Sequence, residues 1–294
     1  MRFEVALDCR CALGEGPVWS VAEQALWFVD IKGRALHRFH PGSGAHRRID
    51  LPEEPGSVGL ARDGGLILSL RSGLYAMTRE GAIGARLAAN PEDQRVSRFN
   101  DGRVDPAGRF LAGTIDETGE RGAATLYRFD ARGLTPLVGG LTTSNGLAFS
   151  PDGRVMYHAD TPRRTVWRFA YDPATGEARD RTVFLRFGDD GDPGRPDGAA
   201  VDAEGCYWTA LWQGGRIQRY APDGRLIEEH ATPALRPTMI AFGGADLSTL
   251  YVTSARIDAK PEEEIATPHA GSLFAMRVTT PGLPEPLFDP AVGG

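Results

Sequence analysis

Hydrophobic and polar residues alternate over short stretches throughout this chain. Runs of four to six residues with this alternation are separated by Gly, Pro, Asp and Asn. A period of two is typical of β-strands with one buried face, and no long segment has the 3.6-residue period of an amphipathic helix. The pattern therefore predicts a protein built almost entirely from β-strands.

The same pair of strands recurs six times along the chain. The second strand of each pair ends in an aromatic residue or methionine, and these strands begin at Leu36, Leu74, Leu126, Val166, Ile217 and Leu273. Successive starts are 38, 52, 40, 51 and 56 residues apart. A repeat of about 40–50 residues that contains several strands indicates a blade of a β-propeller. We predict one all-β domain over residues 1–294, a six-bladed β-propeller.

One predicted strand, Phe3–Leu7, lies outside the six repeats. An unpaired sheet edge invites association with other chains, and a ring of blades must be joined where it begins and ends. We therefore predict that this N-terminal strand pairs with the last blade and closes the ring.

A polar position recurs in every repeat, eight residues before the turn that connects its first two strands. We call these six residues the ring positions: Glu15, Ser57, Asn100, Asn145, Asp197 and Thr238. All six carry a side-chain oxygen. Since the innermost strand of each blade lines the central channel, equivalent positions converge near its axis. We expect the four strongest oxygen donors, Glu15, Asn100, Asn145 and Asp197, to face one another at one end of the channel.

Recurrence across the repeats, more than any single residue, indicates that the ring positions form a binding site. An Asn-Gly or Asp-Gly pair on its own is usually a turn, as in Asn145-Gly146 or Asp197-Gly198. Carboxylates and amides gathered away from water, however, need a cation or a hydrogen-bond network to offset their desolvation. Two carboxylates with neutral oxygens suit one divalent metal ion, Ca²⁺, Mg²⁺ or Mn²⁺, with Zn²⁺ and Fe²⁺ as alternatives. Asp202 belongs instead to the repeated turn and is expected to be structural.

Composition and charge exclude several partners. The net charge is −6 without any basic run, which excludes nucleic acid as a partner. No apolar stretch approaches the length of a membrane span, so we expect no membrane partner. The N-terminus lacks the apolar core of a secretory signal, and Cys9, Cys11 and Cys206 are expected to be reduced thiols in a cytoplasmic protein. A monomer and a small homo-oligomer both stay open.

Four motifs resemble those of the SMP-30/gluconolactonase/regucalcin family. They are LGEGPVW (13–19), SRFNDGRVDPAGR (97–109), SNGLAFSPDG (144–153) and RPDGAAVDAEG (195–205), and their order and separation match the family over nearly the whole chain. The resemblance implies a six-bladed propeller that hydrolyses sugar lactones with one bound divalent metal ion.

The resemblance also assigns roles to individual residues. The metal ligands of the family fall on Glu15, Asn145 and Asp197, and its substrate-binding Arg and Asn fall on Arg98 and Asn100. The family's acidic substrate contact has its nearest counterpart in Glu117. That contact follows an A-G-T sequence, here 112–114.

These residues support hydrolysis of a five- or six-carbon aldonolactone. A divalent ion can polarise the lactone carbonyl, and Asp197 is our choice of general base for the attacking water. Arg98 could donate hydrogen bonds to sugar hydroxyls or to the developing carboxylate. No G-x-S-x-G, H-E-x-x-H or P-loop motif offers another mechanism. Two alternatives remain: a non-catalytic, metal-binding propeller that acts as a regulator or scaffold, and an arylesterase-like propeller.

Overall fold

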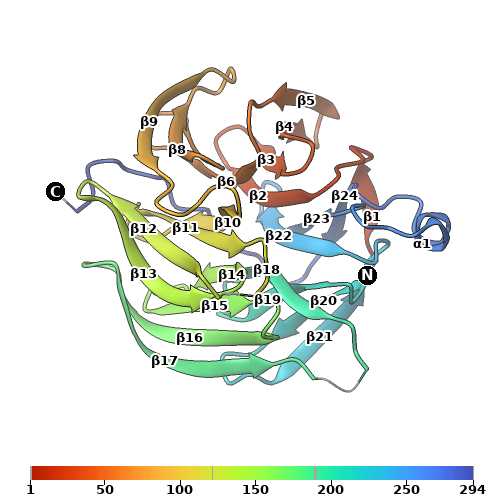
Figure 1. The fold of residues 1–294 in the computed structure, drawn as a ribbon. Helices are drawn as coiled ribbons and strands as arrows, with labels where there is room; N and C mark the ends of the chain where they lie inside the picture. The colour runs from red at the N-terminus through yellow and green to blue at the C-terminus, as the bar shows by residue number, and fades with distance from the viewer. Residues whose placement is uncertain (1, 121, 189–190, 294) are drawn as a thin grey trace.

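Six four-stranded antiparallel sheets stand in a ring around a central channel (Figure 1). The structure is a computed structural model that describes residues 2–120, 122–188 and 191–293. The sheets are the six blades predicted from the repeats, so the prediction of an all-β, six-bladed propeller is confirmed.

The two inner layers of strands form the core of the ring. The innermost strands are β2 (Gly14–Ser20), β6 (Pro55–Leu60), β10 (Ser97–Val104), β14 (Ser144–Phe149), β18 (Arg195–Val201) and β22 (Pro237–Gly243). The second strands are β3 (Ala25–Asp30), β7 (Leu66–Leu70), β11 (Phe110–Asp116), β15 (Val155–Asp160), β19 (Tyr207–Trp212) and β23 (Thr249–Ser254). Nearly every residue of these strands is buried, because each inner strand contacts the inner strands of both adjacent blades.

The two outer layers become progressively more exposed. The third strands are β4 (Ala35–His40), β8 (Gly73–Met77), β12 (Ala124–Asp130), β16 (Thr165–Asp172), β20 (Arg216–Tyr220) and β24 (Leu273–Arg277). The outer strands are β5 (Ala45–Asp50), β9 (Ile83–Ala89), β13 (Gly133–Leu141), β17 (Glu177–Arg186), β21 (Leu226–Ala231) and β1 (Glu4–Leu7). The repeated segments of the sequence are the third strands. Their apolar residues pack between blades, which explains why these segments recur so clearly.

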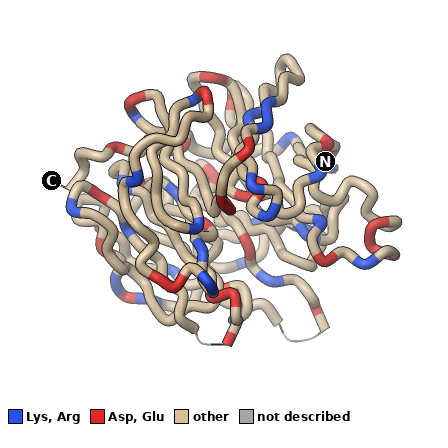
Figure 2. Tube along the Cα trace, turned by 45° about the horizontal axis from the view of Figure 1, so that its top comes forward, with Lys and Arg blue, Asp and Glu red and all other residues tan. Residues whose placement is uncertain are grey.

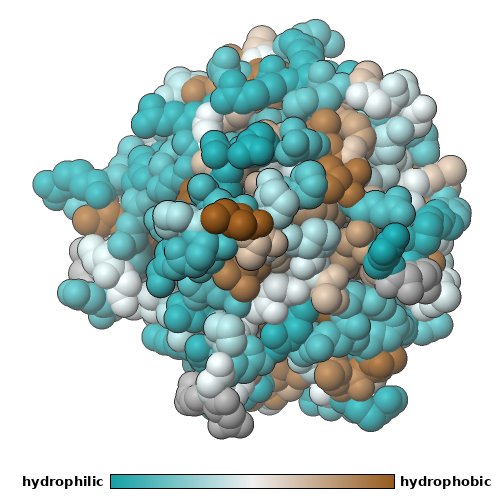
Figure 3. All heavy atoms as spheres, turned by 90° about the vertical axis from the view of Figure 1, so that its right-hand side faces the viewer, coloured by the Kyte–Doolittle hydropathy of each residue, from teal (hydrophilic) through white to brown (hydrophobic). Residues whose placement is uncertain are grey.

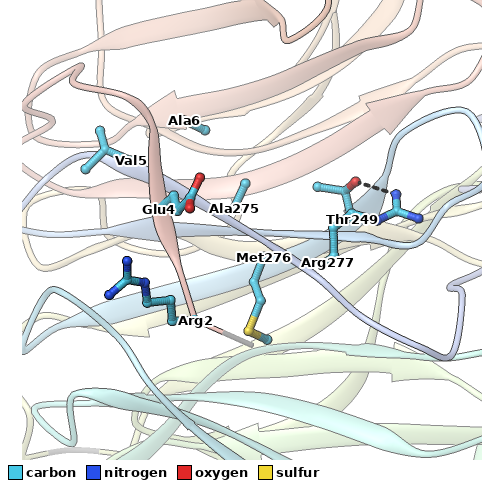
Figure 4. Close-up of a pocket in the computed structure, with 8 residues that line it drawn as sticks. All are labelled: Arg2, Glu4, Val5, Ala6, Thr249, Ala275, Met276 and Arg277. Atoms are coloured by element: carbon cyan, nitrogen blue, oxygen red, sulfur yellow. Dashed lines mark hydrogen bonds between the residues drawn. The ribbon is translucent and has the colours of Figure 1, made fainter.

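The N-terminal strand closes the ring as predicted. β1 pairs antiparallel with β24, with Val5 opposite Phe274 and Leu7 opposite Leu273. The sixth blade therefore combines one strand from the N-terminal part of the chain with three from the C-terminal part. Figure 4 shows Glu4, Val5 and Ala6 beside the residues of β24 at this outer edge. The surface hollow drawn there contains none of the predicted site residues.

The repeated turn is stabilised by its aspartate. Asp202 is fully buried, and its Oδ1 accepts hydrogen bonds from the backbone N–H groups of Glu204 (2.9 Å) and Cys206 (3.0 Å). Its Oδ2 accepts one from Trp208 Nε1 at 2.8 Å. The turn ends at Gly205, whose φ of +81° favours glycine. These contacts agree with the structural role expected for Asp202.

The surface carries charges of both signs. Acidic and basic residues are interspersed along the chain trace (Figure 2). Figure 3 looks onto the side that carries the helix α1 (Pro261–Ala266), and the hydrophobic patches there are small and separated by hydrophilic surface. Within the described ranges, no helix has the length and apolar character needed to cross a membrane.

Candidate functional site at the end of the channel

Each inner strand contains an irregularity at its ring position. The register between the first two strands of every blade shifts at this point, for example between Glu15 and Val18 and between Asn145 and Ala148. A bulge of this kind takes a residue out of the ladder and turns its side chain in a new direction. The recurrence in the sequence therefore reflects a recurrent backbone feature that can turn polar side chains toward the channel.

Three ring residues from consecutive blades form a hydrogen-bonded chain. Asn100 Nδ2 donates to Asn145 Oδ1 at 2.8 Å, and Asn145 Nδ2 donates to Asp197 Oδ1 at 2.7 Å. Asn145 Nδ2 also lies 2.8 Å from Thr161 Oγ1, which fixes the amide plane. All three ring residues are buried. The structure thus brings together the side chains that the repeat comparison grouped.

Glu15 belongs to the same electrostatic environment. Burial is the main cause that raises its pKa, to about 8, and the nearby carboxylate of Asp101 adds to the effect. The pKa of Asp197 is also raised well above its usual value, first by burial and then by Glu15 and Asp101. Carboxylates that raise each other's pKa face a common space, and a cation there would favour their ionised forms.

The donor set fits a hard divalent cation. Among the described residues, Glu15 receives a hydrogen bond only at Oε2, from the N–H of Gly16, and Asp197 receives one only at Oδ1. Each carboxylate therefore keeps one oxygen for a cation. Asn145 Oδ1 accepts a single hydrogen bond and retains a second lone pair. Two carboxylates and an amide oxygen are ligands that Ca²⁺ and Mg²⁺ accept.

The two remaining ring positions have a different role. Ser57 Oγ lies 2.9 Å from Ser69 Oγ in the neighbouring strand β7. Thr238 Oγ1 donates to the carbonyl oxygen of Gly14 at 2.5 Å and lies 2.9 Å from Thr253 Oγ1. These hydroxyls connect adjacent strands. The ring therefore consists of four residues with strong oxygen donors and two that stabilise the inner wall.

Asp101 is a site residue that the sequence comparison missed. It is 5% exposed, its Oδ2 accepts a hydrogen bond from Leu147 N–H at 3.0 Å, and its buried Oδ1 has no partner among the described residues. Burial is the main cause that raises its pKa. The sequence did contain a signal for Asp101, because it is an acidic residue at the position directly after a ring residue. The other five repeats have apolar residues or glycine there: Gly16, Val58, Gly146, Gly198 and Met239.

A cluster of charged residues lies beside this acidic group. Arg98 is 4% exposed, and one of its terminal nitrogens donates to Asn100 Oδ1 at 2.9 Å. Arg98 Nε lies 3.4 Å from Glu117 Oε1, and Glu117 also pairs with Arg71 at 2.9 Å and with Lys32 at 3.5 Å. The predicted substrate contacts Arg98, Asn100 and Glu117 are therefore adjacent, and Glu117 is the most exposed of the three.

Fold and site together define a six-bladed propeller with buried acidic and amide groups at one end of its channel. Comparison with known proteins gives the family. The chain belongs to the SMP-30/gluconolactonase/LRE-like family, whose model matches residues 13–256.

Individual relatives cover almost the whole chain. A 6-deoxy-6-sulfogluconolactonase from Pseudomonas putida is 48% identical over 277 residues, or 94% of each chain. A pentonolactonase from Haloferax volcanii is 38% identical over 98% of each chain. Among solved structures, the calcium-binding protein regucalcin from Agrobacterium tumefaciens superposes with a TM-score of 0.92 at 31% identity, covering 97% of this chain and 96% of that one.

Proposed function

We propose that this protein is a sugar lactonase that opens an aldonolactone to the corresponding sugar acid. The observation that carries the proposal is the buried group of Glu15, Asn100, Asn145 and Asp197, with two acids of raised pKa, at the end of the channel. Relatives named as lactonases of six-carbon and five-carbon sugar acids support this reaction class.

One divalent cation, held by Glu15, Asn145 and Asp197, would act as a Lewis acid toward the lactone carbonyl. The identity of this cation is part of the proposal. All three side chains offer oxygen, and sulfur is absent from this ligand set, which favours a hard ion such as Ca²⁺. The name of the calcium-binding relative agrees with this choice. Zn²⁺, Mn²⁺, Mg²⁺ and Fe²⁺ are the ions to compare with it.

The side chains of the site can then complete the hydrolysis. Asp197 Oδ1 accepts a hydrogen bond from Asn145, and no described residue occupies the other oxygen, whose two lone pairs allow it both to bind the cation and to accept the proton of the attacking water. The water oxygen bonds to the carbonyl carbon, the bond from that carbon to the ring oxygen breaks, and the ring oxygen takes up a proton. Donors on Arg98 and Asn100 can bind sugar hydroxyls, and Glu117 can orient Arg98 or accept from a hydroxyl.

The reaction is tested by acid release from a panel of five- and six-carbon aldonolactones. Protein stripped of metal and resupplied with each ion should recover activity only with its functional ion. Asp197→Asn should lose at least ~10³-fold in kcat with any ion, because it removes the proton acceptor and a charged ligand. Asp246→Asn is the matched control, since Asp246 lies in an exposed turn of the sixth blade and pairs with Arg277.

The alternatives give different results in the same assay. A non-catalytic regulator would bind the ion through Glu15 and Asp197 but release no acid from any lactone. An arylesterase-like enzyme would hydrolyse phenyl esters faster than aldonolactones. Either result, obtained with folded and metal-loaded wild type, would refute the lactonase proposal.

A further inference from the structure

A second cluster of metal-binding residue types lies outside the channel site. It joins the segment between β1 and β2, which carries Cys9 and Cys11, to Asp30 at the end of β3 and His37 in β4. The facing sulfur, oxygen and nitrogen atoms of Cys11, Asp30 and His37 all lie within 4.8 Å of one another, and all three residues are buried. Cys9 Sγ lies 3.5 Å from Cys11 Sγ.

The imidazole of His37 has one occupied and one unoccupied nitrogen. Its Nδ1 lies 2.9 Å from His46 Nε2, whereas its Nε2 is buried and has no hydrogen-bond partner among the described residues. With Nδ1–H donating to His46, Nε2 carries a lone pair. Burial, followed by the influence of His46, lowers the pKa of His37 to about 4, so the ring is neutral at physiological pH. A neutral histidine whose other nitrogen donates a hydrogen bond is the form that binds metals.

Cys11 and Asp30 can serve as ligands beside His37 without large movements, whereas Cys9 lies outside this group of mutually close atoms and would have to turn toward the ion. Asp30 already accepts hydrogen bonds from the N–H groups of Ala12, Leu13 and Gly33, which hold its carboxylate in place and partly offset its charge. Tetrahedral zinc places neighbouring sulfur, nitrogen and oxygen ligands ~3.3–3.8 Å apart. The two sulfurs already have this separation, and the atoms of the three buried ligands need to approach one another by about 1.5 Å at most. Hydrogen bonds alone do not account for the cluster, because they leave His37 Nε2 without a partner.

We propose that Cys9, Cys11, Asp30 and His37 form a structural zinc site, separate from the channel site. Two thiolates and an imidazole are soft and intermediate ligands that favour Zn²⁺ over the hard ions expected in the channel. Binding replaces the thiol protons, which pass to solvent, with bonds to the metal. Cys9 is only partly buried and offers an entry route.

The place of the cluster in the fold suggests its purpose. The segment with Cys9 and Cys11 leads from the last blade into the first, where Cys11 N–H donates to Gly271 O at 2.8 Å and Cys9 Sγ donates to the same oxygen at 3.3 Å. Asp30 and His37 belong to the first blade. A metal ion bound by all four would connect the first blade to the closing segment at the point where the ring could open.

The test measures tightly bound zinc in the full-length protein. The variant Asp197→Asn, in which the channel site is disabled, should retain one Zn²⁺ per chain after dialysis, and adding Cys11→Ser should abolish it. Cys206→Ser in the same background is the matched control, because the Cys206 thiol lies in the fifth blade, far from the cluster in sequence, and is not part of it. His46→Phe should weaken zinc binding ~10–100-fold by removing the partner of His37.

Two further measurements use the unaltered cluster. Co²⁺ added to Asp197→Asn should give the intense near-ultraviolet band of thiolate-to-cobalt charge transfer, and chelation of zinc should lower the unfolding temperature. The proposal is overturned if Asp197→Asn holds no zinc and gives no such band. It is equally overturned if the retained zinc is insensitive to Cys11→Ser, or if mass spectrometry shows Cys9 and Cys11 joined as a disulfide in protein purified under reducing conditions.

Discussion

The raised pKa of Glu15 predicts that the channel site destabilises the metal-free protein. A carboxyl group with a pKa of about 8 when folded and about 4.5 when unfolded holds its proton in the native state over a range in which the unfolded chain has lost it. The folded form therefore binds more protons than the unfolded form between these values, and the free energy of unfolding falls as the pH rises through this window. Below about pH 4.5 the effect is absent, and above about pH 8 it is complete.

The size of the effect follows from the shift. Each pKa unit corresponds to about 1.4 kcal/mol, so the contribution of Glu15 is ~3 kcal/mol at pH 7 and ~4–5 kcal/mol above pH 8. Glu15→Gln keeps the side-chain volume and an oxygen that can accept from the N–H of Gly16, but it cannot ionise. We expect the metal-free variant to be more stable than metal-free wild type at pH 8, by about 3 kcal/mol or more, and to differ little from it at pH 5.

Urea denaturation of metal-stripped protein at pH 5 and pH 8, followed by tryptophan fluorescence, measures this difference. Glu262→Gln is the control, since Glu262 is exposed in α1. Added metal should reduce the difference at pH 8, because an ion at 100 times its dissociation constant stabilises the wild type by ~2.7 kcal/mol and the variant lacks a charged ligand. The reasoning fails if metal-free wild type has equal stability at both pH values, or if Glu15→Gln is the less stable protein at pH 8.

Two substitutions and one deletion test separate parts of the structure. Asp202→Asn should lower the free energy of unfolding by ~1–3 kcal/mol, because buried Arg219 loses one of its three carboxylate partners. Calcium titration should give an unchanged affinity, and a weakened affinity would contradict the separation of turn and site. Arg98→Lys should raise KM for the preferred lactone ~10-fold with a smaller change in kcat, since lysine cannot reproduce the guanidinium contacts to Asn100 and Glu117. Unchanged steady-state kinetics would exclude Arg98 from substrate binding. Deletion of β1 should lower the unfolding temperature by at least ~5 °C and cause aggregation visible by light scattering, because it exposes the edge of β24. A monodisperse variant of normal stability would refute the role of β1 in closing the ring.

The sequence was sufficient to predict the fold because similar strand and turn patterns recur from blade to blade. A strand between two layers requires apolar residues, and the turn after it in most blades contains an aspartate and a glycine, as at Asp202 and Gly205. These local requirements recur at intervals that reveal the blade. The closing strand could be predicted for the same reason, because Phe3–Leu7 had the pattern of a strand and no partner in its own repeat.

Contacts that depend on the packing between blades were harder to predict. The orientation of Asp101 toward the channel depends on the bulge in β10 and on its bond to Leu147 in the next blade. The proximity of Cys11 to His37 depends on how the segment after β1 approaches the first blade. Neither the separation of Asp101 from Leu147 nor that of Cys11 from His37 in the sequence resembles a ligand motif. These residues are brought together by the ring and not by a single strand or turn.

The ring positions show how a repeated fold supports a site that is not symmetric. All six residues lie at the same backbone irregularity, so the bulge alone would place six equivalent side chains around the channel. Ser57 and Thr238 are too short to extend far from the wall, and their hydroxyls are bonded to neighbouring strands. The longer Glu and Asp side chains keep a second oxygen, and Asn145 keeps a second lone pair on its amide oxygen. Differences in side-chain length at one repeated position therefore determine which blades can offer oxygen atoms to the channel, without a change in the backbone that aligns the blades.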